Sequence, residues 1–209
     1  MRALKDYSAY IFDLDGTLYH QMPVQVFMAV RLAVHYGLRP YRFRELLALR
    51  EYRRLRERCF GVEREDFGNV QLEESARLSG LDVETVRKVV ASWLGSKALG
   101  AVRMFRRREL LEAMRGLQAA GKIVAVYSDY PVKDKLRAMG FAADYAYWSG
   151  DEMIRCMKPD CAGLVRILEA LGLGRECVLY VGDRDDRDGV CAEGAGVDYI
   201  DVKEFCRRI

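Results

Sequence analysis

The stretch AYIFDLDGTL, residues 9–18, joins four apolar residues to a short acidic turn. A short run of β-branched and aromatic residues that ends in polar residues is typical of a buried parallel strand. The turn places Asp13 and Asp15 two residues apart, and Gly16 beside them permits a sharp change of chain direction. We therefore expect a strand over Ala9–Phe12 whose carboxyl end presents two carboxylates.

The same arrangement of a short apolar run followed by polar residues recurs along the chain. The further predicted strands are Ile123–Tyr127, Val178–Val181 and Tyr199–Val202, with a weaker candidate at Tyr145–Trp148. Helix-length patterns lie between the strands, at Glu109–Ala120, Lys133–Met139 and Cys161–Leu171, several of them followed by a glycine where helices commonly end. Alternating strands and helices predict an α/β protein with a doubly wound, Rossmann-like parallel sheet.

Residues 20–102 interrupt this alternation, because they show helical periodicity and almost no strand signal. The expected helices are Phe27–Tyr36, Tyr41–Cys59, Asn69–Ser79 and Val83–Leu94. We interpret residues 20–102 as an inserted helical domain, and residues 1–19 and 103–209 as one sheet domain.

The chain of 209 residues is 51% hydrophobic and 31% charged, which allows one large domain or two small ones with a sizeable core. Six cysteines form no C-x-x-C pair and only two histidines are present, so a zinc site is not expected. No signal peptide and no apolar run long enough to cross a membrane are evident. We expect a protein of the reducing cytoplasm that has no membrane partner. The sequence does not indicate the oligomeric state.

The segment RFRELLALREYRRLRERCF, residues 42–60, is rich in arginine and could indicate a nucleic-acid surface. Glu45, Glu51 and Glu57 interleave with the arginines at spacings that allow ion pairs along a helix. The net charge of the chain is only +3. We therefore favour a solvated helix face and expect no nucleic acid as partner.

Three further polar clusters follow predicted strands or lie between them. Ser128-Asp129 follows IVAVY, Lys158-Pro159 precedes a helical pattern that continues through Ile167, and Gly182-Asp183 follows VLYV, with Asp188 five residues after Asp183. The proline suits the first turn of that helix. In an open α/β sheet the carboxyl ends of the strands form the ligand crevice, so these groups are expected to meet there.

Acidic side chains that converge on one crevice repel one another unless a hard cation neutralises them, and oxygen ligands select Mg²⁺. One carboxylate can then attack a phosphoryl group while its neighbour moves protons, and a lysine and a hydroxyl hold the transferring oxygens. A calcium loop is excluded, because its sixth and twelfth positions from Asp13 would be Leu18 and Val24, and from Asp183 they would be Asp188 and Gly194.

The motifs D-x-D-G-T-L, a strand-ending serine, K-P, and G-D followed by further aspartates occur here in the order of the haloacid dehalogenase superfamily. Outside the helical insertion, the chain resembles that superfamily throughout. The resemblance implies that Asp13 is the nucleophile and a metal ligand, and that Asp15 is the general acid and base, with its backbone carbonyl on the metal. Thr17 and Ser128 would then bind phosphate oxygens, together with the backbone amide of Asp129.

By the same resemblance, Lys158 would offset charge on Asp13 and on the phosphoryl group, and Asp183 would complete the Mg²⁺ shell. Asp188 would support the metal's waters rather than bind the ion directly. Asp185 and Asp186 receive no role. His20 is a candidate substrate contact, with simple exposure as the alternative, whereas Tyr19 either lines the site or packs against the insertion.

A helical insertion at this place resembles a mobile cap that closes over the crevice and selects the substrate, with hinges expected near residues 20–23 and 100–103. The resemblance thus implies a phosphatase acting on a small phosphomonoester such as a sugar phosphate, phosphoglycolate or a nucleoside monophosphate. A phosphomutase shares every core residue and is the alternative. A haloacid dehalogenase fits less well, since the relatives that release halide lack a carboxylate at the position of Asp15. An inactive binding protein would have no need of the charge cluster.

Overall fold

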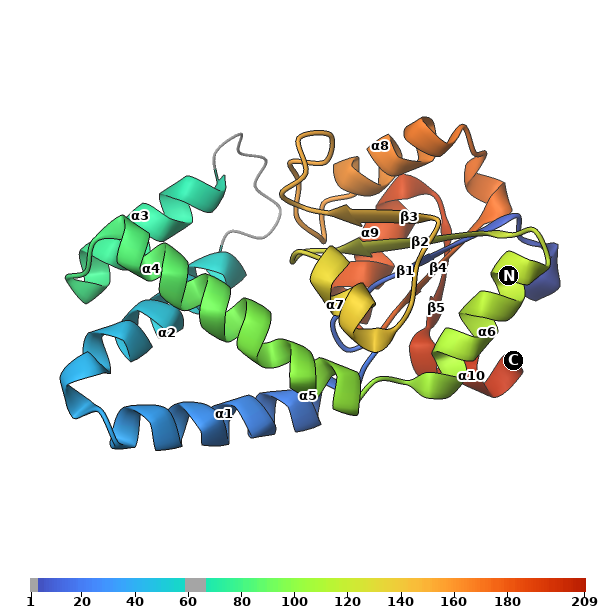
Figure 1. The fold of residues 1–209 in the computed structure, drawn as a ribbon. Helices are drawn as coiled ribbons and strands as arrows, with labels where there is room; N and C mark the ends of the chain where they lie inside the picture. The colour runs from blue at the N-terminus through green and yellow to red at the C-terminus, as the bar shows by residue number, and fades with distance from the viewer. Residues whose placement is uncertain (1–3, 59–66) are drawn as a thin grey trace.

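The structure is a computed structural model that describes residues 4–58 and 67–209. Its centre is a five-stranded sheet of order β3-β2-β1-β4-β5, in which every neighbouring pair is parallel (Figure 1). The strands are β1 Ala9–Phe12, β2 Ile123–Ser128, β3 Tyr145–Trp148, β4 Val178–Gly182 and β5 Asp198–Asp201. The predicted α/β class with a doubly wound parallel sheet is confirmed.

Helices cover both faces of the sheet because alternate residues of each buried strand point to opposite sides. Tyr10 and Phe12 of β1 pack in one hydrophobic cluster, and Ile11 packs in another. The helices are α6 Arg108–Ala119, α7 Lys133–Met139, α8 Ala162–Leu171, α9 Val190–Ala195 and α10 Val202–Arg208. The first cluster receives side chains of α6, α7 and α10, and the second receives side chains of α8 and α9.

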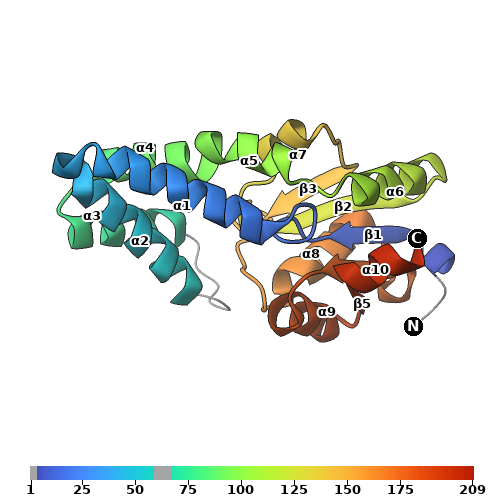
Figure 2. The same ribbon diagram turned by 90° about the horizontal axis from the view of Figure 1, so that it is seen from below.

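The insertion is helical and extends from the end of the sheet at which the strand arrows point (Figures 1 and 2). Its helices are α1 Gln21–Gly37, α2 Phe43–Arg58, α3 Phe67–Ser79, α4 Val83–Val90 and α5 Leu99–Met104, with a π-helical turn at Ala91–Gly95 and a 3₁₀ turn at Ser96–Ala98 between the last two. Thus α1 begins six residues before the predicted start at Phe27, and the helix predicted over Val83–Leu94 changes from α to π after Val90. The predicted end of the second helix, Cys59, lies outside the described residues.

The chain enters and leaves the insertion side by side. Tyr19 and Arg106 form an antiparallel bridge, the backbone N–H of His20 donates to the Phe105 carbonyl at 3.0 Å, and that of Arg107 donates to the Leu18 carbonyl at 2.9 Å. The two crossings therefore lie at residues 18–20 and 105–107. The predicted hinge segments fall instead almost wholly within α1 and α5, where helical hydrogen bonds restrict backbone rotation.

Two local predictions were wrong. Pro159 does not lie in the first turn of a helix, because α8 begins at Ala162, whose backbone N–H is bound by the Asp160 carboxylate at 2.8 Å. Val202 does not end the last strand, because Asp201 caps a helix that starts there: its side chain accepts from the backbone N–H of Lys203. Within residues 4–58 and 67–209, the structure contains no helix with the length and apolar character to cross a membrane.

Candidate active site

Strand β1 is central in the sheet, with β2 and β4 on either side. Phe12, its last residue, is paired with Val126 of β2 and Val181 of β4. The polar residues that follow these three strands therefore leave the sheet at one edge, the edge that faces the insertion in Figure 1. This shared edge is where the sequence predicts the chemistry.

A buried lysine joins two of the aspartates. The ammonium of Lys158 lies 2.6 Å from a carboxylate oxygen of Asp13 and 2.6 Å from one of Asp188, and all three side chains are buried. Burial raises the pKa of Asp13, and so do the neighbouring carboxylates, while Lys158 opposes the shift. Burial lowers the pKa of Lys158, but Asp13 and Asp188 outweigh it and raise that pKa above its usual range. The lysine is therefore a permanent positive charge beside Asp13.

Three carboxylates approach one another at this edge. One oxygen from each of Asp13, Asp183 and Asp188 lies within 4.8 Å of the others. Burial, followed by repulsion from Asp188, raises the pKa of Asp183 to about 6. Such a set of oxygen donors, whose charges are only partly offset by Lys158, suits a hard divalent cation such as Mg²⁺.

Asp188 also organises the loop that carries Asp183. Its second carboxylate oxygen accepts the backbone N–H groups of Asp183 and Arg184, each at 3.2 Å. A Cβ at Gly182 would lie 2.5 Å from that of Asp188, so the close approach requires glycine there. Asp188 thus holds both Lys158 and the Asp183 loop in place.

Asp15 is surrounded by polar groups of its own. One of its carboxylate oxygens accepts from the Tyr19 hydroxyl and the Lys135 ammonium, and the other accepts from the Ser128 hydroxyl at 3.2 Å. Burial raises the pKa of Asp15, but Lys135 and the hydrogen bonds more than offset it and lower the pKa below its usual value. Lys135 was not predicted from the sequence, because it stands on α7 without any motif.

The remaining predicted residues divide into two groups. The hydroxyl of Thr17 donates to Asp183 at 3.4 Å, and the Asp129 carboxylate accepts from the Ser149 hydroxyl at 2.7 Å and from the backbone N–H of Lys158 at 3.0 Å. These contacts bring Thr17 and Asp129 into the same site as the aspartates. His20 stands apart, since its side chain is exposed at the crossing into α1.

A family model of haloacid dehalogenase-like hydrolases matches residues 7–196. The chain belongs to this family. A search of curated proteins found no match to this haloacid dehalogenase-like hydrolase.

Solved structures share the fold of this hydrolase. A haloacid dehalogenase-like hydrolase from Bacteroides fragilis is 21% identical, covers 92% of this chain and 86% of its own, and has a TM-score of 0.56. A 2-haloacid dehalogenase from Pseudomonas syringae pv. tomato is 19% identical and has a TM-score of 0.60. The match covers 92% of this chain and 85% of the dehalogenase. The HAD-hydrolase YfnB from Bacillus subtilis, solved bound to magnesium, is 16% identical and has a TM-score of 0.63. The match covers 92% of this chain and 87% of YfnB.

One side chain of the insertion reaches the site of this hydrolase. The guanidinium of Arg56, on α2, donates to the backbone carbonyl of Asp129 and lies 4.4 Å from the ring centre of Tyr130. Arg56 is buried, whereas Arg50, Arg53 and Arg54 on the same helix are exposed. The interpretation of this segment as a solvated face thus holds for its exposed arginines but fails for Arg56, which links the insertion to the sheet domain. It also fails for Glu45 and Glu51, which are buried.

Proposed function

We propose that this hydrolase is a Mg²⁺-dependent phosphatase that acts on a small phosphomonoester through an aspartyl-phosphate on Asp13. The observation that carries the proposal is the carboxyl group of Asp15, held beside Asp13 by Tyr19, Ser128 and Lys135. A phosphomonoester needs such a group because its leaving oxygen must be protonated.

In the proposed first step, a carboxylate oxygen of Asp13 attacks phosphorus while the bond from phosphorus to the ester oxygen breaks, and Asp15 gives its proton to the departing alcohol. In the second step, Asp15 takes a proton from water, whose oxygen attacks the same phosphorus and returns Asp13 as a free carboxylate. Lys158 stays charged throughout and offsets the negative charge that builds up beside Asp13. In this proposal Thr17 and Ser128 donate to phosphate oxygens, together with the amide of Asp129.

The residues that would hold Mg²⁺ are Asp13, Asp183 and the backbone carbonyl of Asp15, with Asp188 supporting the metal's waters. The cluster of three carboxylate oxygens fits such an ion, and one structural relative was solved with magnesium. When bound, the cation would neutralise part of the charge on the phosphoryl oxygens.

Several structural relatives are dehalogenases, so dehalogenation is an alternative to phosphate release. A halide ion leaves without a proton, and a dehalogenase therefore needs no general acid at the position of Asp15. The helical insertion, which contacts the sheet domain through Arg56, is proposed to act as a cap that limits access to small substrates. A reducing cytoplasm, suited to the free thiols of the described cysteines, completes the proposal.

The test is a phosphate-release assay over a panel of sugar phosphates, phosphoglycolate and nucleoside monophosphates, with Mg²⁺ or with chelator, alongside halide release from 2-haloacids. Asp13→Asn should reduce turnover to background, and Asp15→Asn should reduce it about 10²–10⁴-fold. Asp134→Asn, at an exposed carboxylate of α7 paired with Arg137, is the matched control and should leave turnover unchanged. Isomerised product in place of phosphate would indicate a mutase, and halide release without phosphate release would overturn the proposal.

A further inference from the structure

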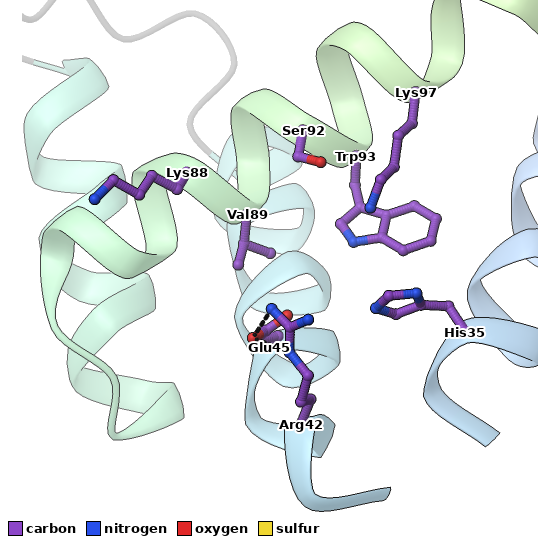
Figure 3. Close-up of a pocket in the computed structure, with 8 residues that line it drawn as sticks. All are labelled: His35, Arg42, Glu45, Lys88, Val89, Ser92, Trp93 and Lys97. Carbon is purple, nitrogen blue, oxygen red and sulfur yellow. Dashed lines mark hydrogen bonds and ion pairs between the residues drawn. The ribbon is translucent and has the colours of Figure 1, made fainter. Parts of the chain in front are cut away.

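A hollow lies within the helical insertion, apart from the acidic cluster of the sheet domain. Its volume is about 230 Å³, and its lining residues belong to α1, the 3₁₀ turn Pro40–Arg42, α2, α4 and the turns that follow α4 (Figure 3). This volume is smaller than the range of about 300–1,000 Å³ that is usual for drug-sized ligands. The hollow therefore suits a small molecule or ion.

One wall of this pocket is aromatic and carries a cation. Trp93 is buried, with the ring of His35 packed edge-on at a centroid distance of 5.1 Å and the ring of Tyr36 at 5.8 Å. The ammonium of Lys97 lies 3.9 Å from the centre of the Trp93 ring, and Figure 3 shows it pointing toward that ring. The aromatic packing fixes the indole, and the indole in turn holds the ammonium at the pocket.

Positive charge exceeds negative charge around the pocket. The Glu45 carboxylate is already bound by Arg42 at 2.7 Å and by the Tyr36 hydroxyl at 3.2 Å. Among the described residues, no carboxylate lies within ion-pair distance of Lys97, and Arg31 donates to the backbone carbonyl of Lys97 at 2.9 Å. The Lys88 side chain lines the pocket but points away from Trp93 in Figure 3.

The neighbouring cations affect one another. Burial, followed by repulsion from Arg31 and Arg42, lowers the pKa of Lys97. A guanidinium nitrogen of Arg39 lies 3.3 Å from Nδ1 of His35, and because a guanidinium can only donate, this ring nitrogen acts as the acceptor. A negatively charged ligand would relieve the repulsion among these groups.

The backbone is irregular at this place. Trp93 lies in the π-helical turn Ala91–Gly95, and Lys97 lies in the 3₁₀ turn Ser96–Ala98 that follows it. Single π-helical turns within α-helices are frequently found at functional sites. The irregular segment is thus the part of the insertion that presents both the indole and the ammonium to the pocket.

We propose that this pocket binds a small oxyanion with two or more negative charges, held by Lys97 and Arg42 against the Trp93 ring. Phosphate and dicarboxylate ions share this chemistry. A bound anion would connect the end of α1, the start of α2 and the turn before α5, and would stabilise the insertion by mass action. The proposal is independent of the reaction at Asp13.

The experiment uses the indole as a local reporter. The chain has two tryptophans, so Trp148→Phe in the full chain leaves Trp93 as the only one. The emission of Trp93 is followed during titration with inorganic phosphate or with malonate, against potassium chloride at matched ionic strength. We expect a saturable change, and Lys97→Met in the same background should weaken binding at least about tenfold because a charge-assisted contact is lost.

Two further variants make the result decisive. Lys97→Arg keeps the charge and should bind within about threefold of the parent, whereas Arg77→Met removes an exposed cation of α3 that does not line the pocket and should change nothing. If Lys97→Met does not fold, as judged by circular dichroism, Lys97→Gln replaces it. Saturation by phosphate alone or by malonate alone assigns the class of anion. Equal curves for the parent and Lys97→Met, or a change that chloride reproduces, would overturn the proposal.

Discussion

Gly16 lies so close to Asp183 that a Cβ at position 16 would stand 2.1 Å from a carboxylate oxygen of that aspartate. Gly16 also has a φ of +104°, a conformation that residues with a side chain rarely adopt. Two independent constraints, backbone conformation and the space that Asp183 occupies, therefore require glycine in the acidic turn. The first motif and the last motif are thus fitted to each other across the site.

Gly16→Ala should lower the free energy of unfolding by about 2 kcal/mol or more, since the left-handed backbone alone costs an L-residue about 1–2 kcal/mol. Displacement of Asp183 should also weaken the proposed Mg²⁺-dependent turnover. Urea unfolding and the phosphate-release assay measure the two effects. Gly116→Ala, in the exposed middle of α6 with nothing near its Cβ, is the control and should be neutral or stabilising. Equal behaviour of the two variants would contradict this account of Gly16.

Lys158→Met should destabilise the protein by about 3–5 kcal/mol, because it leaves Asp13 and Asp188 buried side by side without the cation that both contact. Urea unfolding in the presence of chelator measures the cost. The double variant with Asp188→Asn should lose less than the sum of the two single variants, since the amide removes one of the stranded charges. Additive losses would show that the two side chains act independently.

The sequence predicted the sheet well because each strand is a short apolar run with a polar end. Asp13, Asp183 and Lys158 belong to motifs that follow such runs or lie between them, so their arrival at one edge of the sheet follows from parallel strand order. Helix ends were less accurate: the change from α to π geometry at Ala91 has no signal in an apolar periodicity that continues unbroken to Leu94.

Residues that reach the site from other elements could not be predicted. Lys135 stands on an ordinary helix and Arg56 among several arginines with the same spacing, so nothing local distinguishes either from a solvated side chain. Their positions depend on how α7 and α2 lie against the strand ends. Such contacts between distant segments are set by packing and not by local pattern.

Lys135→Met should move the pH dependence of kcat/KM. Burial raises the pKa of Asp15, and the ion pair with Lys135 is the largest influence that lowers it, so removing the ammonium raises this pKa. The step that needs protonated Asp15 would then persist to higher pH, and the alkaline limb of the profile should shift upward. Lys135→Arg keeps the charge and should leave the limb near its original place. A parallel loss at every pH would show a purely structural role for Lys135.

Metal binding should weaken in acid because Asp183 must lose its proton to bind a cation. Burial and the neighbouring Asp188 raise the pKa of Asp183 to about 6, well above its usual value. Without metal, the proton is bound more tightly in the folded than in the unfolded state, so this group's contribution to stability is present at low pH and is lost as pH rises through 6. In the proposed site, Mg²⁺ would replace the proton above that pH. The rise in thermal midpoint caused by Mg²⁺ should therefore be larger about 1.5 units above this pKa than about 1.5 units below it. Asp183→Asn, which cannot titrate, should show a small rise at both pH values; a rise in this variant equal to that of the parent would exclude Asp183 as a ligand.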